Sequence, residues 1–343
     1  MLRALLVLLV MASSASAATW HVQADGLGDV PTIQAAVDSA APGDTLLLAD
    51  GTYRGDGNRD VSVNKMLRIW SESNDPEACI IDCEGSSATP HRAFSIAGGS
   101  DDPDISGLSV VNSWQAWGGA IWAEPPGVDV RNCIFSGNTH GCVFIADRGS
   151  PSVISECVFR DNHAYSASAV FVYYHHSTII IEHSLFVDNN SEWTTVTVDD
   201  DYGDLQVRLN NCTFVGNSGY YSAIENVGSE DCELNNCIIA FGAGESSPCY
   251  DCYINCSAFY ENQPDPGWLP PWGSGNFTGC PSFCDYLADP PDFNICSGSP
   301  CAPGNHPYGA ECGLIGALGV GCVCGPSRAE AATLGSIKSR FRE

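Results

Sequence analysis

Asn132-Cys-Ile-Phe-Ser-Gly-Asn138 opens a series of four segments that align without gaps. In each segment, a Cys or Ser is followed by Phe two residues later and by Asn three residues after the Phe. Asn236-Cys-Ile-Ile is a degenerate fifth copy, and Phe259-Tyr-Glu-Asn262 keeps the Phe and the Asn. An internal repeat of this kind decides the architecture of a chain. The other full copies are Glu156-Cys-Val-Phe-Arg-Asp-Asn162, His183-Ser-Leu-Phe-Val-Asp-Asn189 and Asn211-Cys-Thr-Phe-Val-Gly-Asn217.

The period of the repeat restricts the fold. Its phenylalanines are 24, 27 and 28 residues apart, and the units contain short β-prone runs such as 170–172, 179–181 and 195–198. A unit of this length cannot bury its apolar face alone, whereas stacked units can. A propeller blade needs about 40 residues or more, and the consensus of leucine-rich repeats is absent. The sequence therefore predicts an all-β, single-domain parallel β-helix.

Stacking gives the repeated residues structural roles. The Phe residues form an inward aromatic column, and the preceding Cys or Ser points to the same side because side chains alternate along a strand. The Asn lies at a turn, where it tolerates left-handed geometry and can bond to the next Asn of the stack. We interpret these columns as a structural ladder, with members Phe135, Phe159, Phe186, Phe214, Asn138, Asn162, Asn189 and Asn217.

The chain resembles the right-handed parallel β-helix proteins of the pectate-lyase-like superfamily. Its F-x-x-N repeats and Gly118-Gly119-Ala120-Ile121 are also similar to the polymorphic outer-membrane protein repeat family, which is associated with exported adhesins. The F-x-x-N motif occurs five times and the GGAI motif once, so the resemblance to this repeat family is partial. It implies a right-handed solenoid whose superfamily contains lyases, glycosidases and esterases.

Both ends of the solenoid are predicted to be capped. Residues 18–262 form the β-helix, and within it 18–53 form an N-terminal cap with a short helix at 32–40, ended by Pro42-Gly43. Residues 263–325 are rich in Cys and Pro and resemble the closing segment of exported bacterial β-helix proteins, so we expect a disulfide-rich C-terminal cap. Residues 326–343 are a tail, either a sorting signal or a frayed terminus.

The first 17 residues have the pattern of a signal peptide: Arg3, an apolar run over 4–11, and Ala15-Ser16-Ala17 as the cleavage site. The run is too short to span a membrane, which takes about 20 residues. We expect a protein that is secreted or held at the cell surface, without a transmembrane segment after cleavage.

Cysteine usage agrees with export. All 18 cysteines follow the signal peptide, and 12 fall between Cys232 and Cys324, which predicts disulfides in the C-terminal cap. Zinc bound by the pairs Cys249/Cys252 and Cys280/Cys284 is the alternative. The cysteines of the column are expected to be a mostly reduced ladder, namely Cys133, Cys157, Cys212 and Cys237.

Charge excludes several partners. Lys and Arg number 14 and Asp and Glu number 41, which gives a net charge of −27. Nucleic-acid binding depends on Lys and Arg contacts to phosphate, so nucleic acid is excluded as a partner. The same balance disfavours an anionic membrane surface and any polyanionic substrate that no cation bridges. A polysaccharide or cell-surface glycan is the expected partner, and the chain is expected to be a monomer.

Candidate catalytic residues are few. The sequence has neither the GHG and RIK motifs of polygalacturonase-type hydrolases nor G-x-S-x-G, and 100–262 contains no Lys. The acidic turn 199–204 offers carboxylates for acid–base chemistry or for calcium, and a solvated loop is the alternative. Candidate catalytic residues are Asp199, Asp201, Asp204, His163 and Arg208, and the candidate calcium ligands are Asp199, Asp201 and Asp204.

Large aromatic residues recur just after the column Asn, where a turn faces water. Stacked coils would align them along one edge at about 4.8 Å per coil, and aromatic faces suit the apolar faces of sugars. The alternative is that the rings fold back over the coil edges. We therefore predict a binding protein for glycans, adhesin-like and without an evident catalytic site, and as alternative a polysaccharide lyase or glycoside hydrolase. The predicted binding residues are Trp114, Tyr165, Trp193, Tyr220 and Tyr221.

Overall fold

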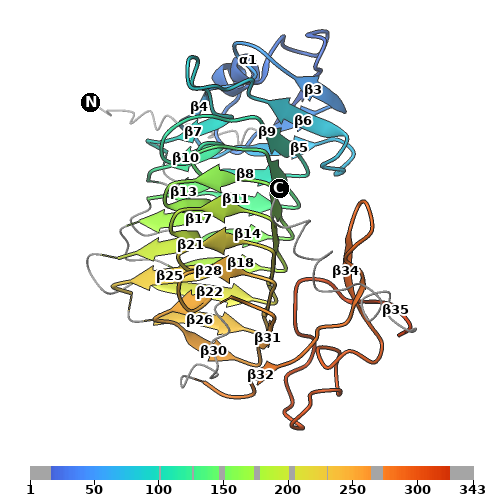
Figure 1. Ribbon diagram of the computed structural model, residues 1–343. Coiled ribbons are helices and arrows are strands. Elements are labelled where there is room, and N and C mark those ends of the chain that lie inside the picture. The colour runs from blue at the N-terminus through green and yellow to red at the C-terminus, as the bar shows by residue number, and fades with distance from the viewer. Residues whose placement is uncertain are drawn as a thin grey trace, which may run out of the picture.

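The chain folds as a parallel β-helix whose axis runs vertically in Figure 1. The computed structural model describes residues 17–99, 102–125, 127–146, 151–173, 178–200, 205–229, 231–263 and 273–324. Each complete coil passes through sheet 1, sheet 2 and sheet 3 before it returns to sheet 1, and the coils from residue 163 onward also pass through a short sheet 4 between sheets 2 and 3. Neighbouring strands of these four sheets are parallel, as the repeat predicts.

Sheets 1 and 2 contain ten strands each. Sheet 1 consists of β1 (Thr19–Val22), β2 (Thr45–Leu48), β5 (Arg68–Ser71), β8 (Asp104–Ser106), β11 (Asp129–Arg131), β14 (Ser152–Ser155), β18 (Thr178–Glu182), β22 (Gln206–Asn210), β26 (Asp231–Asn235) and β30 (Tyr253–Asn255). Sheet 2 consists of β3 (Gly51–Tyr53), β6 (Cys79–Asp82), β9 (Ser109–Val111), β12 (Ile134–Ser136), β15 (Val158–Arg160), β19 (Leu185–Val187), β23 (Thr213–Val215), β27 (Ile238–Ala240), β31 (Ala258–Tyr260) and β32 (Phe277–Thr278).

Sheet 3 lies on the left in Figure 1, and the short sheet 4 lies between sheets 2 and 3 along the chain. Sheet 3 consists of β4 (Val61–Val63), β7 (Phe94–Ile96), β10 (Ile121–Ala123), β13 (Val143–Ile145), β17 (Ala167–Tyr173), β21 (Thr194–Asp199), β25 (Ile224–Val227) and β29 (Cys249–Tyr250). Sheet 4 consists of β16 (His163–Ala164), β20 (Asn190–Ser191), β24 (Ser218–Gly219) and β28 (Ala243–Gly244).

The predicted aromatic column fills the core. Phe135, Phe159, Phe186 and Phe214 are Cα partners on adjacent strands, and all four are buried. Their rings are nearly parallel, with centroids 4.9, 5.0 and 4.4 Å apart along the series. Ile239 and Phe259 extend the column at its C-terminal end. The repeat therefore sets the register of sheet 2, as predicted.

The predicted Asn ladder also forms. The side-chain oxygen of Asn162 accepts from the backbone N–H of Asn138, and that of Asn189 accepts from the N–H of Asn162. Each amide group also donates to a backbone carbonyl of the preceding coil, as Asn189 does to Phe159 at 2.8 Å. The left-handed residue is the one before the Asn rather than the Asn itself, with φ of 56° at Asp161 and 51° at Asp188. This corrects the predicted turn geometry, because the Asn contributes its side chain and its neighbour the unusual backbone.

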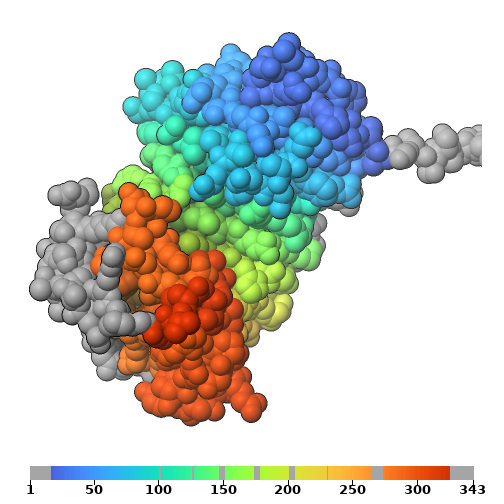
Figure 2. All heavy atoms as spheres, turned by 90° about the vertical axis from the view of Figure 1, so that its right-hand side faces the viewer, coloured from blue at the N-terminus to red at the C-terminus, as the bar shows by residue number. Residues whose placement is uncertain are grey.

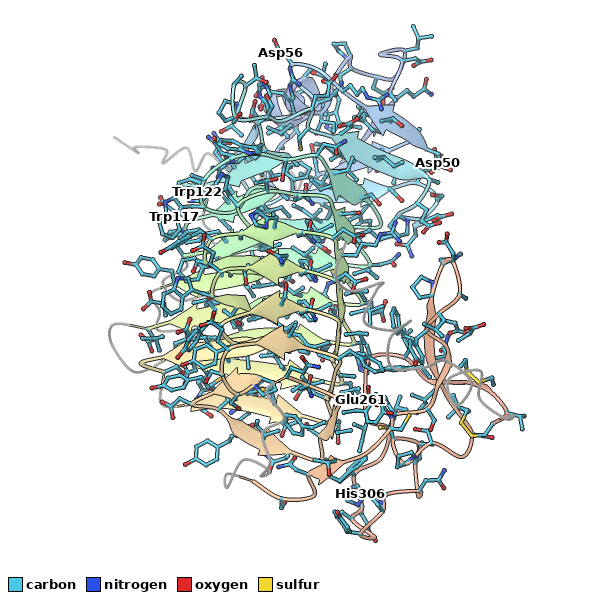
Figure 3. All side chains as sticks on the ribbon, in the orientation of Figure 1. Asp50, Asp56, Trp117, Trp122, Glu261 and His306 are labelled. Carbon is cyan, nitrogen blue, oxygen red and sulfur yellow. A yellow bond between two sulfur atoms is a disulfide. The ribbon has the colours of Figure 1, made fainter. Side chains whose placement is uncertain are left out.

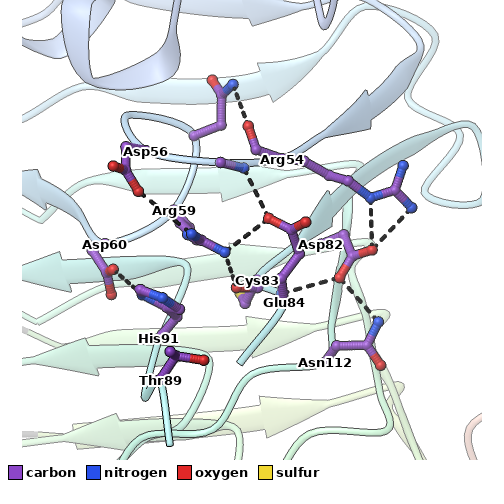
Figure 4. A network of polar contacts seen from close by, with 12 residues as sticks. Arg54, Asp56, Arg59, Asp60, Asp82, Cys83, Glu84, Thr89, His91 and Asn112 are labelled. Carbon is purple, nitrogen blue, oxygen red and sulfur yellow. Dashed lines mark hydrogen bonds and ion pairs between the residues drawn. The ribbon is translucent and has the colours of Figure 1, made fainter. Parts of the chain in front are cut away.

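The N-terminal end is covered as predicted. Helix α1 (Ile33–Ser39) begins after Thr32, whose side chain accepts from the N–H of Ala35 at 3.2 Å. A polar network then joins loops of neighbouring coils (Figure 4). In it Arg54 pairs with Asp82 at 2.9 Å, and Arg59 pairs with Glu84 at 2.8 Å.

The C-terminal segment 273–324 contains two disulfides, Cys284–Cys322 and Cys296–Cys324, and a third, Cys256–Cys312, joins it to the solenoid. It includes the strands β33 (Phe283–Asp285), β34 (Asp292–Cys296) and β35 (Val320–Cys322). Rather than only closing the end, it lies along the outer face of sheet 2, as Figure 2 shows. Phe293 packs on Val187 and Val215 of that face.

Hydrogen bonds fix this segment to individual coils. The N–H of Ala317 donates to the hydroxyl of Thr213 at 2.8 Å, and the N–H of Gly316 donates to the carbonyl of Asn236 at 2.7 Å. The disulfides fit an extracellular protein. Across the described ranges, no helix has the length and apolar character needed to cross a membrane.

The free cysteines lie mostly in the solenoid. Cys133, Cys157, Cys212 and Cys237 are buried and not in disulfides, which confirms the predicted reduced ladder. Burial raises the pKa of Cys157 and of Cys212 well above the ordinary value of a thiol. The bond of Cys284 to Cys322 contradicts the alternative in which Cys284 shares a zinc ion with Cys280.

Candidate functional site

The edge between sheet 4 and sheet 3 carries a line of aromatic rings, which we call the aromatic ridge and define as Tyr165, Trp193, Tyr220, Tyr221 and Tyr250. The N–H of Trp193 donates to the carbonyl of Tyr165 at 3.2 Å, and the N–H of Tyr221 donates to that of Trp193 at 2.7 Å. These three residues therefore lie one above another on successive coils. The predicted alignment of aromatic residues along one edge is present for them.

Four of the five rings of the ridge form a continuous series of contacts. Ring centroids are 5.7 Å apart for Trp193 and Tyr220, 4.9 Å for Tyr220 and Tyr221, and 5.2 Å for Tyr221 and Tyr250. The exposed fractions are 62% for Tyr165, 41% for Trp193 and 37% for Tyr220, whereas Tyr221 is 9% exposed. Tyr250 is 48% exposed, so the ridge presents four open rings, with Tyr221 packed among its neighbours.

Trp114 lies apart from the ridge. Its backbone bridges to His91 on one side and to Thr139 on the other, in line with sheet 4. Its half-buried ring meets the His140 ring edge-on at 4.5 Å. Of the five predicted binding residues, Trp114 thus belongs to a different line of side chains, because its coil places its turn residues differently.

A second group of aromatic residues covers the outer face of sheet 3 and was missed by the sequence analysis. Trp117 is 60% exposed and stacks on Phe171 at 5.7 Å, while Phe144 lies 6.1 Å from Trp117. Figure 3 shows Trp117 and Trp122 on the same side of the solenoid. The signal was available, since Phe144 and Phe171 alternate with buried aliphatic residues at equivalent positions of β13 and β17.

A pocket of about 160 Å³ lies where these two groups meet. It is lined by 116–118, 140–141 and 164–167, together with Val143 and Phe171. Burial and the neighbouring His163 lower the pKa of His140, so its imidazole is neutral at pH 7. No described residue of the lining carries a charge at neutral pH.

A larger and more open groove continues along the C-terminal part of the ridge. Its volume is about 520 Å³, and Tyr220, Glu192, Glu245 and Gln263 are among the side chains that line it. The groove offers carboxylate and amide groups beside an exposed ring. This combination can accept and donate hydrogen bonds to hydroxyl groups while a ring covers an apolar face.

Two carboxylates lie next to the ridge on the outer face of sheet 3. Glu225 is the Cα partner of Thr197, and Asp199 follows Thr197 on the same outer face of β21. Burial and the charge of Asp199 raise the pKa of Glu225, and Glu225 in turn helps to raise the pKa of Tyr221. Glu225 was not among the predicted residues, because a single Glu in a strand carries no motif.

The predicted catalytic residues do not converge. Asp199 ends β21 in sheet 3, His163 begins β16 in sheet 4, and Arg208 lies in β22 of sheet 1. Arg208 is engaged with Asp231 at 3.3 Å and Glu233 at 3.5 Å.

The predicted calcium site stays a prediction. Asp201 and Asp204 lie outside the described residues, and Asp199 is the one predicted ligand whose position can be given. Within the described part of the chain, no group of three or more His, Cys, Asp or Glu residues is arranged to hold a metal ion.

Comparisons with known proteins agree with the fold. Residues 69–204 match the family model described as right-handed β-helix region, which supports the predicted handedness. No curated protein sequence matches the chain.

The similar solved structures include three lyases. Pectate lyase Pel9A has 12% identity and a TM-score of 0.55, over 89% of this chain and 97% of that one. A rhamnogalacturonan lyase has 12% identity and a TM-score of 0.43, over 71% and 69%. An alginate lyase from Paenibacillus sp. str. FPU-7 has 11% identity and a TM-score of 0.38, over 90% and 99%. The likeness to the pectate lyase shows a shared fold.

Proposed function

We propose that the protein binds an extended polysaccharide along the aromatic ridge. The observation that carries this proposal is the backbone register of Tyr165, Trp193 and Tyr221, which stacks aromatic positions coil on coil. Successive coils rise by about 4.8 Å, close to the length of one sugar unit in an extended glycan. A straight glycan could therefore contact the exposed rings of Tyr165, Trp193 and Tyr220 one after another without bending.

The chemistry of the ridge suits sugars. Exposed rings cover the apolar face of a pyranose and lose little side-chain entropy on binding. Glu192, Glu245 and Gln263 line the groove beside Tyr220, where they can bond to hydroxyl groups at the ring edge. Exposed aromatic residues that touch one another along several coils are unusual on a surface that has no partner.

The similar solved structures include enzymes whose names refer to pectate, rhamnogalacturonan and alginate. We carry over to this chain only the idea of a polysaccharide ligand. The partial resemblance to adhesin repeats agrees with a binding role outside the cell, at a surface or in the medium.

The test is retention on a panel of insoluble polysaccharides by the mature protein and by the double variant W193A/Y220A. We expect the double variant to lose about tenfold or more in affinity, with a melting temperature within about 4 °C of the parent. The matched control is Y253A/Y308A, which removes two exposed rings away from the ridge. Retention of no polysaccharide by the parent, or equal losses in both double variants, would refute the proposal.

Glu225 and Asp199 support a second candidate, cleavage of the bound glycan by acid–base chemistry. Outward carboxylates on neighbouring strands fall near the separation of about 5–9.5 Å that glycosidases use. A carboxyl group with a raised pKa beside a second carboxylate is the arrangement expected of a general acid. New reducing ends that the parent releases and E225Q does not, while E225Q still binds, would establish this activity. Release of no reducing or unsaturated ends by the parent excludes it.

A further inference from the structure

We propose that the pocket between Trp117 and Tyr165 is a subsite for one uncharged pyranose ring of the bound glycan. The proposal rests on the proposed function, and it names the class of glycan as neutral. The reasons are the shape of the coil edge at this point, the size of the pocket and the charges around it.

The pocket exists because one coil has a short edge. Val143 comes four residues after Thr139, whereas the equivalent Val170 comes seven residues after His163. On the other side, Ile121 also comes seven residues after Trp114. The middle coil is therefore indented by three residues between two longer neighbours, and we call this indentation the notch.

The notch has aromatic walls. Trp117 lies in the longer edge of the preceding coil, and Tyr165 lies in that of the following coil. The two flanking coils are about 9.6 Å apart along the axis, and the Trp117 ring leans across part of this distance onto Phe171, with a centroid distance of 5.7 Å. At the floor, Gly141 has φ of 81°, and a Cβ there would lie 2.5 Å from the carbonyl oxygen of Ala167. A side chain at this position is therefore excluded, which keeps the notch open.

The volume fits a single ring. A cavity of about 150 Å³ is known to hold one benzene molecule, and the pocket has about 160 Å³. Its floor is apolar, with Val143, Ala164 and Ala167. The neutral imidazole of His140 and the hydroxyl of Ser166 are available to bond to sugar hydroxyl groups.

Charge selects the ligand. A carboxylate buried without a cation partner is strongly disfavoured, and none of the described lining residues is cationic. Arg92 is buried and is not part of the pocket lining. Its guanidinium donates to the carbonyl of Ala116, in the loop that also carries Trp117, at 3.0 Å. Further along the ridge the neighbouring charges are carboxylates, as at Glu192 and Glu245. A uronate carboxylate would lose its hydration in the apolar notch without a cationic partner in the lining, and an ammonium group would lose its hydration there as well.

Two surface variants test the subsite. A116W places a large ring at the exposed rim of the notch, and W117A removes one wall, while neither changes the ridge. A88W is the matched control, because Ala88 is an exposed alanine in another loop. Titration calorimetry measures the affinity of each protein for three ligands. They are a neutral oligosaccharide of the polysaccharide that the parent retains, the same oligosaccharide carboxylated at C6, and an amino-sugar oligomer. The carboxylated ligand is measured with and without added calcium.

We expect the neutral oligosaccharide to bind the parent and A88W equally, and to bind A116W and W117A about tenfold more weakly. The carboxylated counterpart should bind the parent at least about tenfold more weakly, with or without calcium. Equal binding of the charged and neutral oligosaccharides, or an unchanged affinity of A116W and W117A, overturns the subsite while the ridge remains supported by its own variants. Binding of no oligosaccharide by the parent overturns both proposals.

Discussion

Replacement of Phe186 by Ala is the sharpest test of the core. Phe186 is fully buried and stacks on Phe159 on one side and on Phe214 on the other. A buried Phe→Ala change destabilises a protein by about 3–5 kcal/mol, and each aromatic pair contributes about 0.5–1.5 kcal/mol beyond burial. Because Phe186 loses two ring partners, we expect a loss near the upper end, about 4–5 kcal/mol.

Phe135 provides the internal comparison. It is equally buried, but it has one ring partner, Phe159, and its other neighbour in the column is Val110. F135A should therefore cost about 0.5–1.5 kcal/mol less than F186A. Urea unfolding followed by tryptophan fluorescence measures both free energies of unfolding, provided that the denaturant slopes of the two variants agree. An equal or smaller loss for F186A would refute the stacking argument.

Three further predictions concern hydrogen bonds, thiols and pH. N189A should cost about 1–3 kcal/mol in urea unfolding, because it removes the acceptor of the buried N–H of Asn162 and a donor to the carbonyl of Phe159. A loss below about 1 kcal/mol would count against the ladder. Thiol titration in denaturant should find 12 free thiols without reductant and 18 after reduction, with the exposed Cys280 reacting first in the native protein; no free thiol at all would exclude the reduced ladder. The N–H groups of Ala18 and Ala41 lower the pKa of Asp44 below its ordinary value of 3.8, so its contribution is present above that value and is lost as the pH falls through the lowered pKa. D44N should therefore show a weaker loss of thermal stability on acidification than the parent, and identical slopes would contradict this.

The interior of the solenoid was predictable because it repeats. Phe159 and Phe186 occupy equivalent places in successive coils, so the pairing of these two residues sets the register of the other repeats as well. The edges were harder, since each coil has its own edge length. Counting from the column Asn located Tyr165 and Trp193 on the ridge, but the same counting chose Trp114 and missed Trp117, which lies further along a longer loop.

Contacts between distant parts of the chain left no pattern in the sequence. The predicted disulfide-rich segment exists, yet nothing in its composition indicates that Ala317 bonds to Thr213, more than one hundred residues earlier. Glu225 was missed for the same reason, because its neighbour Asp199 belongs to another coil. Residues that repeat with a fixed period can be paired from the sequence alone. Contacts that occur once in the molecule, such as that of Ala317 with Thr213, are found only from the structure.

The side-on position of segment 273–324 has a consequence for how such a chain can change in length. Its hydrogen bonds and apolar contacts hold the coils that contain β19, β23 and β27. A duplicated coil inserted there would move Thr213 and Asn236 about 4.8 Å relative to the segment and break those bonds. A coil gained or lost before β19 would leave them intact, so variation in coil number among descendants of this chain should accumulate in the N-terminal half.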